Sequence, residues 1–128
     1  MNNNYIYRNN VNLFSPENGY NLGNMFQDLY DQYKDYKPVQ LKARNDQERS
    51  YLELSRISFA MHEMNLYLDL HPNDQKIQKL FNDYRKMFVD LEKKYGQKYG
   101  ALTTCSDSLE EMPFNWATTS FPWEGLDV

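Results

Sequence analysis

The two histidines, His62 and His71, are residues whose type could support metal binding or acid–base chemistry. Whether they can do so depends on the residues around them. His62 is followed by Glu63, which begins the zinc-protease pattern His-Glu-x-x-His. That pattern needs a second imidazole four residues after the first, and position 66 is Leu66. A di-metal helical bundle needs a histidine three residues after a glutamate, which is again position 66. We therefore expect no metal site and no metal cofactor.

An acid and imidazole cluster lies further along, at Asp69, His71 and Asp74. Groups this close can exchange protons, but acidic residues beside Pro72 are equally suited to satisfying helix ends. No phosphate-binding loop or oxyanion-type glycine element accompanies them. Cys105 has no basic neighbour that would favour a thiolate, so an inert or occasionally cross-linked thiol is expected. The sequence therefore predicts no catalytic residues, no cofactor and no enzyme.

The elements around these residues are two helices. Asn45 and Glu48 resemble a capping box, and Asn73 or Asp74 caps a second helix after His71-Pro72. The link is about three residues long, which forces the helices antiparallel. The sequence thus predicts an all-α protein, an antiparallel helical hairpin over 46–70 and 74–95 that stops near Gly96. Apolar residues at helical spacing form its two stripes: Leu54, Ile57, Met61, Met64 and Leu68, then Ile77, Leu80, Phe81, Tyr84, Met87, Phe88, Leu91 and Tyr95.

The flanks of the hairpin have weaker patterns. Residues 1–14 are expected to be an irregular arm. A short helix is predicted over 24–36 from helical spacing that ends before Pro38. Residues 101–128 have no period and are expected to be an extended aromatic tail. The chain is thus divided into an arm with linker (1–44), the hairpin (45–100) and the tail (101–128).

Composition limits the possible partners. The chain carries 11 Tyr, 7 Phe and 2 Trp, and a net charge of −4 that argues against nucleic-acid binding. No apolar run is long enough to span a membrane, and the N-terminus lacks a secretory signal, so synthesis in a cytosol is expected. Residues 73–98 are basic, whereas residues 101–128 hold five acidic side chains and no basic one. Both segments can be plain solvated surface, or the tail can fold onto the basic helix of its own or a neighbouring chain.

A two-helix hairpin leaves its outer faces uncovered. The predicted helix over 24–36, the tail or another chain must cover them. We therefore expect the isolated chain to self-associate or to be loosely packed, and a homo-oligomer is one expected state.

Residues 51–128 resemble CotJB-type spore coat proteins. The segment LYLDLHPND, Leu66 to Asp74, carries the match, together with the aromatic end NWATTSFPWE. Ala101 replaces the family's usual proline, and the end reads Ser-Phe-Pro-Trp in place of Pro-Trp-Pro-Trp. Further matching positions follow at the family's spacing: Phe81, Tyr84, Leu91, Tyr95, Tyr99 and Gly100.

The resemblance implies synthesis in the mother-cell cytoplasm of a sporulating bacterium and deposition in the spore coat. It also implies a partner, the manganese-catalase-like CotJC type, to which any manganese would belong. Within the N-terminal extension, SPENGYNLGNMFQDLYDQY resembles the end of CotJA-type coat proteins, which makes these a second candidate partner class. The match is carried by Gly23, Met25, Phe26, Leu29 and Tyr30.

The function expected is that of a structural coat component that docks onto another coat protein; the alternative is an accessory factor that controls the assembly or activity of the catalase-like partner. Clustered aromatics without a helical period suit partner anchors, although the tail can instead cover its own hairpin. The predicted partner-binding residues are Phe114, Trp116, Phe121, Pro122 and Trp123, with Phe26 and Tyr30.

Overall fold

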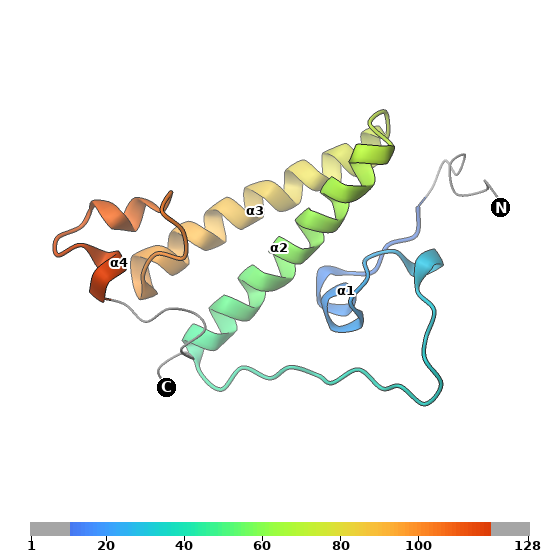
Figure 1. The fold of residues 1–128 in the computed structure, drawn as a ribbon, viewed down its shortest axis with the longest axis horizontal. Helices are drawn as coiled ribbons and strands as arrows, with labels where there is room; N and C mark the ends of the chain where they lie inside the picture. Colours follow the sequence, from blue (N-terminus) through green and yellow to red (C-terminus); the bar gives the residue numbers. More distant parts are fainter. Residues whose placement is uncertain (1–10, 119–128) are drawn as a thin grey trace.

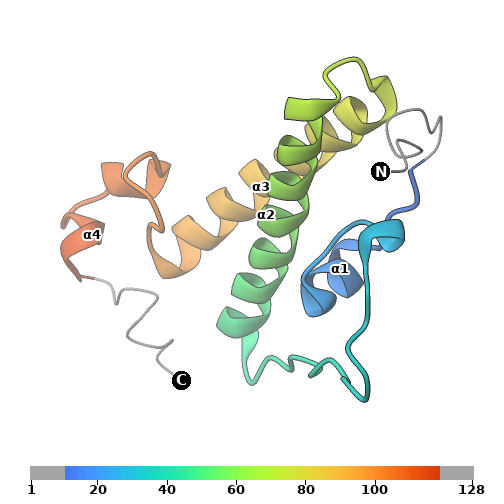
Figure 2. The ribbon, with the colours of Figure 1, turned by 45° about the vertical axis from the view of Figure 1, so that its right-hand side comes forward.

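The computed structural model describes residues 11–118, and all the regular elements in that range are helical (Figure 1). Two 25-residue helices, α2 (Asp46–Leu70) and α3 (Gln75–Tyr99), pack antiparallel and confirm the predicted hairpin. Two views show the helices close together at the connecting turn and diverging away from it (Figures 1 and 2). The open end of the pair is bridged by Tyr95, which contacts Tyr51 at 6.0 Å between ring centroids.

The start of α2 uses the predicted cap with one difference. The backbone N–H of Glu48 donates to Asn45 Oδ1 at 2.8 Å, as a capping box requires. The Glu48 carboxylate does not complete the box at Asn45. It accepts from the backbone N–H of Arg44 at 2.8 Å and pairs with the Arg44 guanidinium at 2.6 Å. The carboxylate thereby fixes the residue before the cap and sets the direction in which the chain enters α2.

The short N-terminal helix lies earlier than predicted. It is α1 (Pro16–Leu22), with Ser15 as its cap, Pro16 in its first turn and Gly23 at φ 79° closing it. The range 24–36 contains only the 3-10 turn η2 (Gln27–Leu29), so the predicted helix there was wrong.

The physical reason is a tertiary pairing that local spacing does not reveal. Leu13 and Phe26 form an antiparallel bridge, in which the N–H of Phe14 donates to the carbonyl of Met25 at 2.8 Å. The N–H of Gln27 donates to the carbonyl of Asn12 at 3.1 Å. The Met25 carbonyl, which would accept from the N–H of Leu29 in such a helix, is used across the bridge, and Phe26 has extended backbone at φ −101° and ψ 112°.

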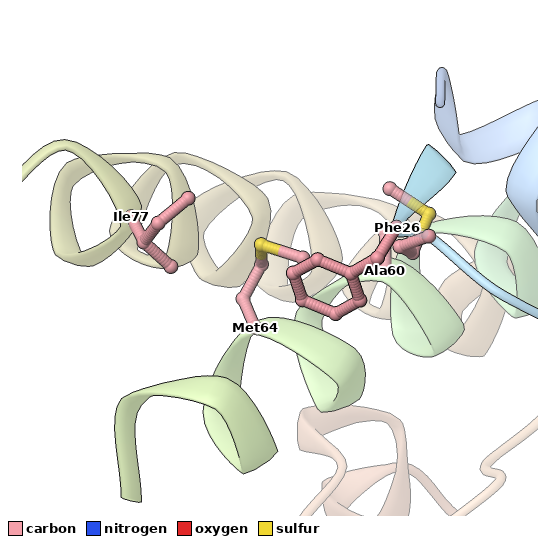
Figure 3. Close-up of a cluster of buried hydrophobic side chains, with 5 residues drawn as sticks. Phe26, Ala60, Met64 and Ile77 are labelled. Carbon is pink, nitrogen blue, oxygen red and sulfur yellow. The ribbon is translucent and has the colours of Figure 1, made fainter. Parts of the chain in front are cut away.

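The core is built where this N-terminal segment lies against the hairpin. Helix α2 lies between α1 and α3 (Figures 1 and 2). Met25 is fully buried, and Gly19 permits this because a Cβ at that position would overlap Met25 Sδ. The segment thus covers an outer face of the hairpin. Figure 3 shows the buried cluster, which comprises Met25, Phe26, Ala60, Met64 and Ile77.

The far end of α3 departs from the prediction at Gly96, which is inside the helix. The helix continues to Tyr99 and ends at Gly100. A Cβ at Gly96 would lie 2.8 Å from Ser106 Oγ, so the glycine allows the following chain to pack closely on the helix. That chain forms the 3-10 turn η3 (Asp107–Glu110) and the single turn α4 (Asn115–Thr118), so this part of the predicted extended tail is compact.

An ion pair joins the acidic C-terminal segment to the basic helix α3. Lys93 Nζ lies 3.8 Å from Asp107 Oδ2, so a basic residue of α3 and an acidic residue of η3 do meet within one chain. Both side chains are more than half exposed, so this pair adds little stability, roughly 0–1 kcal/mol.

A connecting segment, residues 30–44, joins the N-terminal part to α2. It contains no helix, and it runs outside the helices from the neighbourhood of η2 to the start of α2 (Figure 1). Nearly all of its side chains between positions 31 and 42 are exposed, so it contributes almost nothing to the core.

Candidate partner-binding surface

The predicted anchors at the C-terminal end divide into described and undescribed residues. Phe114 precedes α4 and is 54% exposed, and Met112 beside it is 92% exposed. Trp116, inside α4, is half-buried. Phe121, Pro122 and Trp123 lie outside the described residues. The described part of the tail therefore presents apolar side chains to solvent on a base formed by η3 and the end of α3.

The two N-terminal candidates have intramolecular contacts. Phe26 is 7% exposed, and its ring stacks on that of Tyr67 at 5.4 Å between centroids. Tyr30 is half-buried and meets Phe14 edge to face at 5.9 Å. The Phe26 ring is thus part of the core, and it offers a partner almost no surface.

An apolar groove lies beside Phe26, between the chain at 23–29 and the C-terminal half of α2. Its volume is about 400 Å³. Leu70, at 81% exposure, and Leu29 and Leu66, each at half or more, line its rim. The full lining comprises Val11, Gly23, Asn24, Phe26, Asp28, Leu29, Glu63, Leu66, Tyr67, Leu70 and His71.

Sequence reasoning missed this groove, although part of its signal was present. Leu66 and Leu70 are four residues apart on one helix, so they share a face. Neither leucine belongs to the predicted apolar stripe of this helix, whose last members are Met64 and Leu68. The two leucines therefore cannot both pack in the interface between the two helices of the hairpin. Apolar residues off the buried stripe of a helix indicate a second apolar surface.

The turn residues that resembled an acid–base cluster have structural roles. Asp74 Oδ1 accepts from the N–H of Ile77 at 3.2 Å and so caps α3, while its Oδ2 accepts from Tyr67 Oη at 2.9 Å. Burial, and then the Asp74 carboxylate, raise the pKa of Tyr67 to about 12. The His71 ring lies 4.3 Å from that of Tyr67. These contacts tie the end of α2 to the start of α3 and hold the wall of the groove.

Glu63 and Asp28 are the acidic residues of the groove lining, and Glu63 is the more buried of the two. It lies in the lining and is half-buried, and this burial raises the pKa of its carboxyl, with a smaller opposing effect from His62. Among residues 11–118, no ion pair to the Glu63 carboxylate is present. A desolvated carboxylate without a cation is stabilised by any positive group that enters the groove.

Between residues 11 and 118, no three His, Cys, Asp or Glu side chains are grouped so as to hold a metal ion. In the same range, none of the helices is both long and apolar enough to cross a membrane.

Comparison with known proteins decides the family. The CotJB protein family matches residues 48–124, which is more than half of the chain. The chain belongs to the CotJB family. Membership implies a protein of the bacterial spore coat. No curated protein and no solved structure matches the chain.

The CotJB match covers nearly all of α2, then α3, η3 and α4. It does not include the first 47 residues, and the resemblance of that extension to CotJA-type proteins has no support. The groove therefore has one wall from the CotJB part, with Leu66 and Leu70, and one wall from the extension, with Leu29.

Proposed function

We propose that this CotJB-family chain is a structural component of the spore coat that docks onto another coat protein through its aromatic C-terminal end. The observation that carries the proposal is the exposure of Met112 and Phe114 at the end of the packed chain. Three further apolar residues, Phe121, Pro122 and Trp123, follow within ten positions.

The placement of these residues supports an anchoring role. An anchor binds best when its base is already ordered, because less conformational entropy is lost on binding. The base here is η3, which lies against α3 where Gly96 removes a side chain. Phe114 thus extends from a fixed base, while Pro113 and Pro122 limit the conformations of the backbone around it.

The partner proposed is the manganese-catalase-like coat protein of the CotJC type. This choice rests on CotJB family membership and on the resemblance described above, which implies a CotJC-type partner. The manganese chemistry would belong to that partner, and this chain would contribute binding surface with no catalytic residue of its own.

Substitution of the exposed anchor tests the proposal. Co-expression with the CotJC-type protein should give a complex that survives size-exclusion chromatography. Phe114→Ala should weaken that complex by about tenfold or more, because truncating an aromatic anchor commonly costs ~2 kcal/mol of binding. Val89→Ala is the matched control, since Val89 is 52% exposed on α3. Equal binding by both variants and the unmodified chain would contradict the proposal.

A further inference from the structure

We propose that the apolar groove beside Phe26 receives the connecting segment, residues 30–44, of a second copy of this chain. The contact joins unlike surfaces, a groove on one copy and a segment on the next. It does not depend on the C-terminal end, so it can hold whether or not the proposed partner docking is correct.

The groove side supplies apolar surface and two acidic residues, Asp28 and Glu63. Leu29, Leu66 and Leu70 surround a space of about 400 Å³, enough for a few large side chains. Three leucines exposed this far around one concavity are costly in water, and covering them is favourable. Glu63 lies in the same lining without an ion pair among the described residues, so the occupant that fits best carries a cation near its apolar side chains.

The connecting segment has that composition. Tyr33 and Val39 are 82% and 76% exposed, and neither is a member of the core cluster of its own chain. Lys37 and Lys42 are exposed on the same segment, and no acidic residue follows Asp35 before Asp46. Pro38 also restricts the backbone, which lowers the cost of ordering it on binding.

The geometry of the chain favours a second copy over its own segment. The segment begins after Leu29, in the wall of the groove, and must reach the first residue of α2. A 25-residue helix is about 37 Å long. The 15 residues of the segment span at most about 50 Å and run along the outside of the helix pair, so little chain remains to fold back into the groove (Figure 1).

A contact between unlike surfaces has a consequence for assembly. Each copy keeps one free groove or one free segment after its first contact, so copies add until a ring closes or an open chain grows. A spore coat protein that extends itself in this way can form a ring or a filament without another component.

Charge reversal on each side tests the contact in the full chain. Sedimentation velocity over a concentration series should show the unmodified chain associating. Glu63→Lys alone and Lys37→Glu alone should each weaken association by about tenfold or more, because each places like charges together. Mixed in equal amounts, the two variants should recover association, since the groove of each variant then meets a segment of opposite charge on the other. The double variant should recover association.

Three further variants complete the design. Glu53→Lys and Lys86→Glu reverse exposed charges outside the groove and should associate like the unmodified chain. Leu70→Ser removes an apolar side chain that is 81% exposed, so it should leave the helical circular dichroism unchanged and still weaken association.

Several results would overturn the inference. The inference fails if the unmodified chain remains monomeric at high concentration, or if mixing the two single variants does not restore association. If residues 1–10 or another segment of the same chain fill the groove, Lys37→Glu will associate like the unmodified chain, and the inference fails.

Discussion

At the scale of single residues, Asp74 connects the two long helices. One carboxylate oxygen caps α3 and the other accepts from Tyr67 of α2. The capping role was predictable, because Asp before a helical stripe is a local signal. The bond to Tyr67 was not, because it crosses a turn whose geometry is set by Pro72 and by the packing of both helices.

The hydroxyl of Tyr67 yields a prediction with a defined pH dependence. Its pKa is raised from 10.0 to about 12, so the folded state favours the protonated phenol. The stabilisation is therefore complete below pH 10 and is lost as the pH rises towards 12. Tyr67→Phe should lower the free energy of unfolding by about 1 kcal/mol at pH 8, and the deficit should shrink at pH 11. Urea unfolding at both pH values measures it.

The control for that experiment is Tyr33→Phe, which alters a tyrosine that is mostly exposed in the connecting segment. It should leave stability unchanged at both pH values. If Tyr67→Phe lowers the free energy of unfolding by the same amount at pH 8 and at pH 11, ionisation of the hydroxyl does not affect stability.

At the scale of elements, the hairpin was predictable and its neighbours were only partly so. The stripes of α2 and α3 and the short link between them are local in sequence, and both helices were expected within a few residues of their observed bounds. The N-terminal helix was placed too late, because the Leu13–Phe26 bridge uses a backbone carbonyl that a helix over 24–36 would need. The sequence does contain the start and stop signals of α1, which are Ser15 with Pro16 at its start and Gly23 at its end. They lie outside the segment in which apolar residues recur at helical spacing.

A prediction about the packing of these elements concerns the stability of a Gly96 variant. Ala usually stabilises a helix interior relative to Gly by about 1 kcal/mol. Here the new Cβ would lie 2.8 Å from Ser106 Oγ, which is hydrogen-bonded to Ser108 Oγ at 2.9 Å. Gly96→Ala should therefore destabilise the protein by about 1–2 kcal/mol and displace η3 from α3. Thermal unfolding, with hydrogen exchange over residues 101–111, measures both effects.

A second substitution separates crowding from other causes. Ser106→Gly removes the oxygen that the Cβ would meet, so the double variant should regain part of the stability lost in Gly96→Ala. A higher Tm for Gly96→Ala than for the unmodified chain would contradict the close packing of η3 on this helix.

At the scale of the whole molecule, sequence patterns gave the hairpin and the resemblance to CotJB, but not the groove. The groove has walls from positions 23–29 and 63–71, which are brought together by the burial of Met25 and Phe26 against α2. The local pattern indicates only the wall on α2, through Leu66 and Leu70, because the opposite wall is brought there by tertiary packing. The tail anchors were predicted from aromatic content, and Phe114 is 54% exposed, but its role as an anchor stays a prediction.

The most direct test of the central claim is truncation after Glu111, measured by co-purification with the CotJC-type partner. The truncated chain is expected to keep its helical circular dichroism and its Tm but to lose the partner. Loss of the partner together with a lower Tm and more exposed apolar surface would show that the tail covers its own hairpin. Partner binding that is unchanged by the truncation would contradict the claim that this chain docks through its aromatic end.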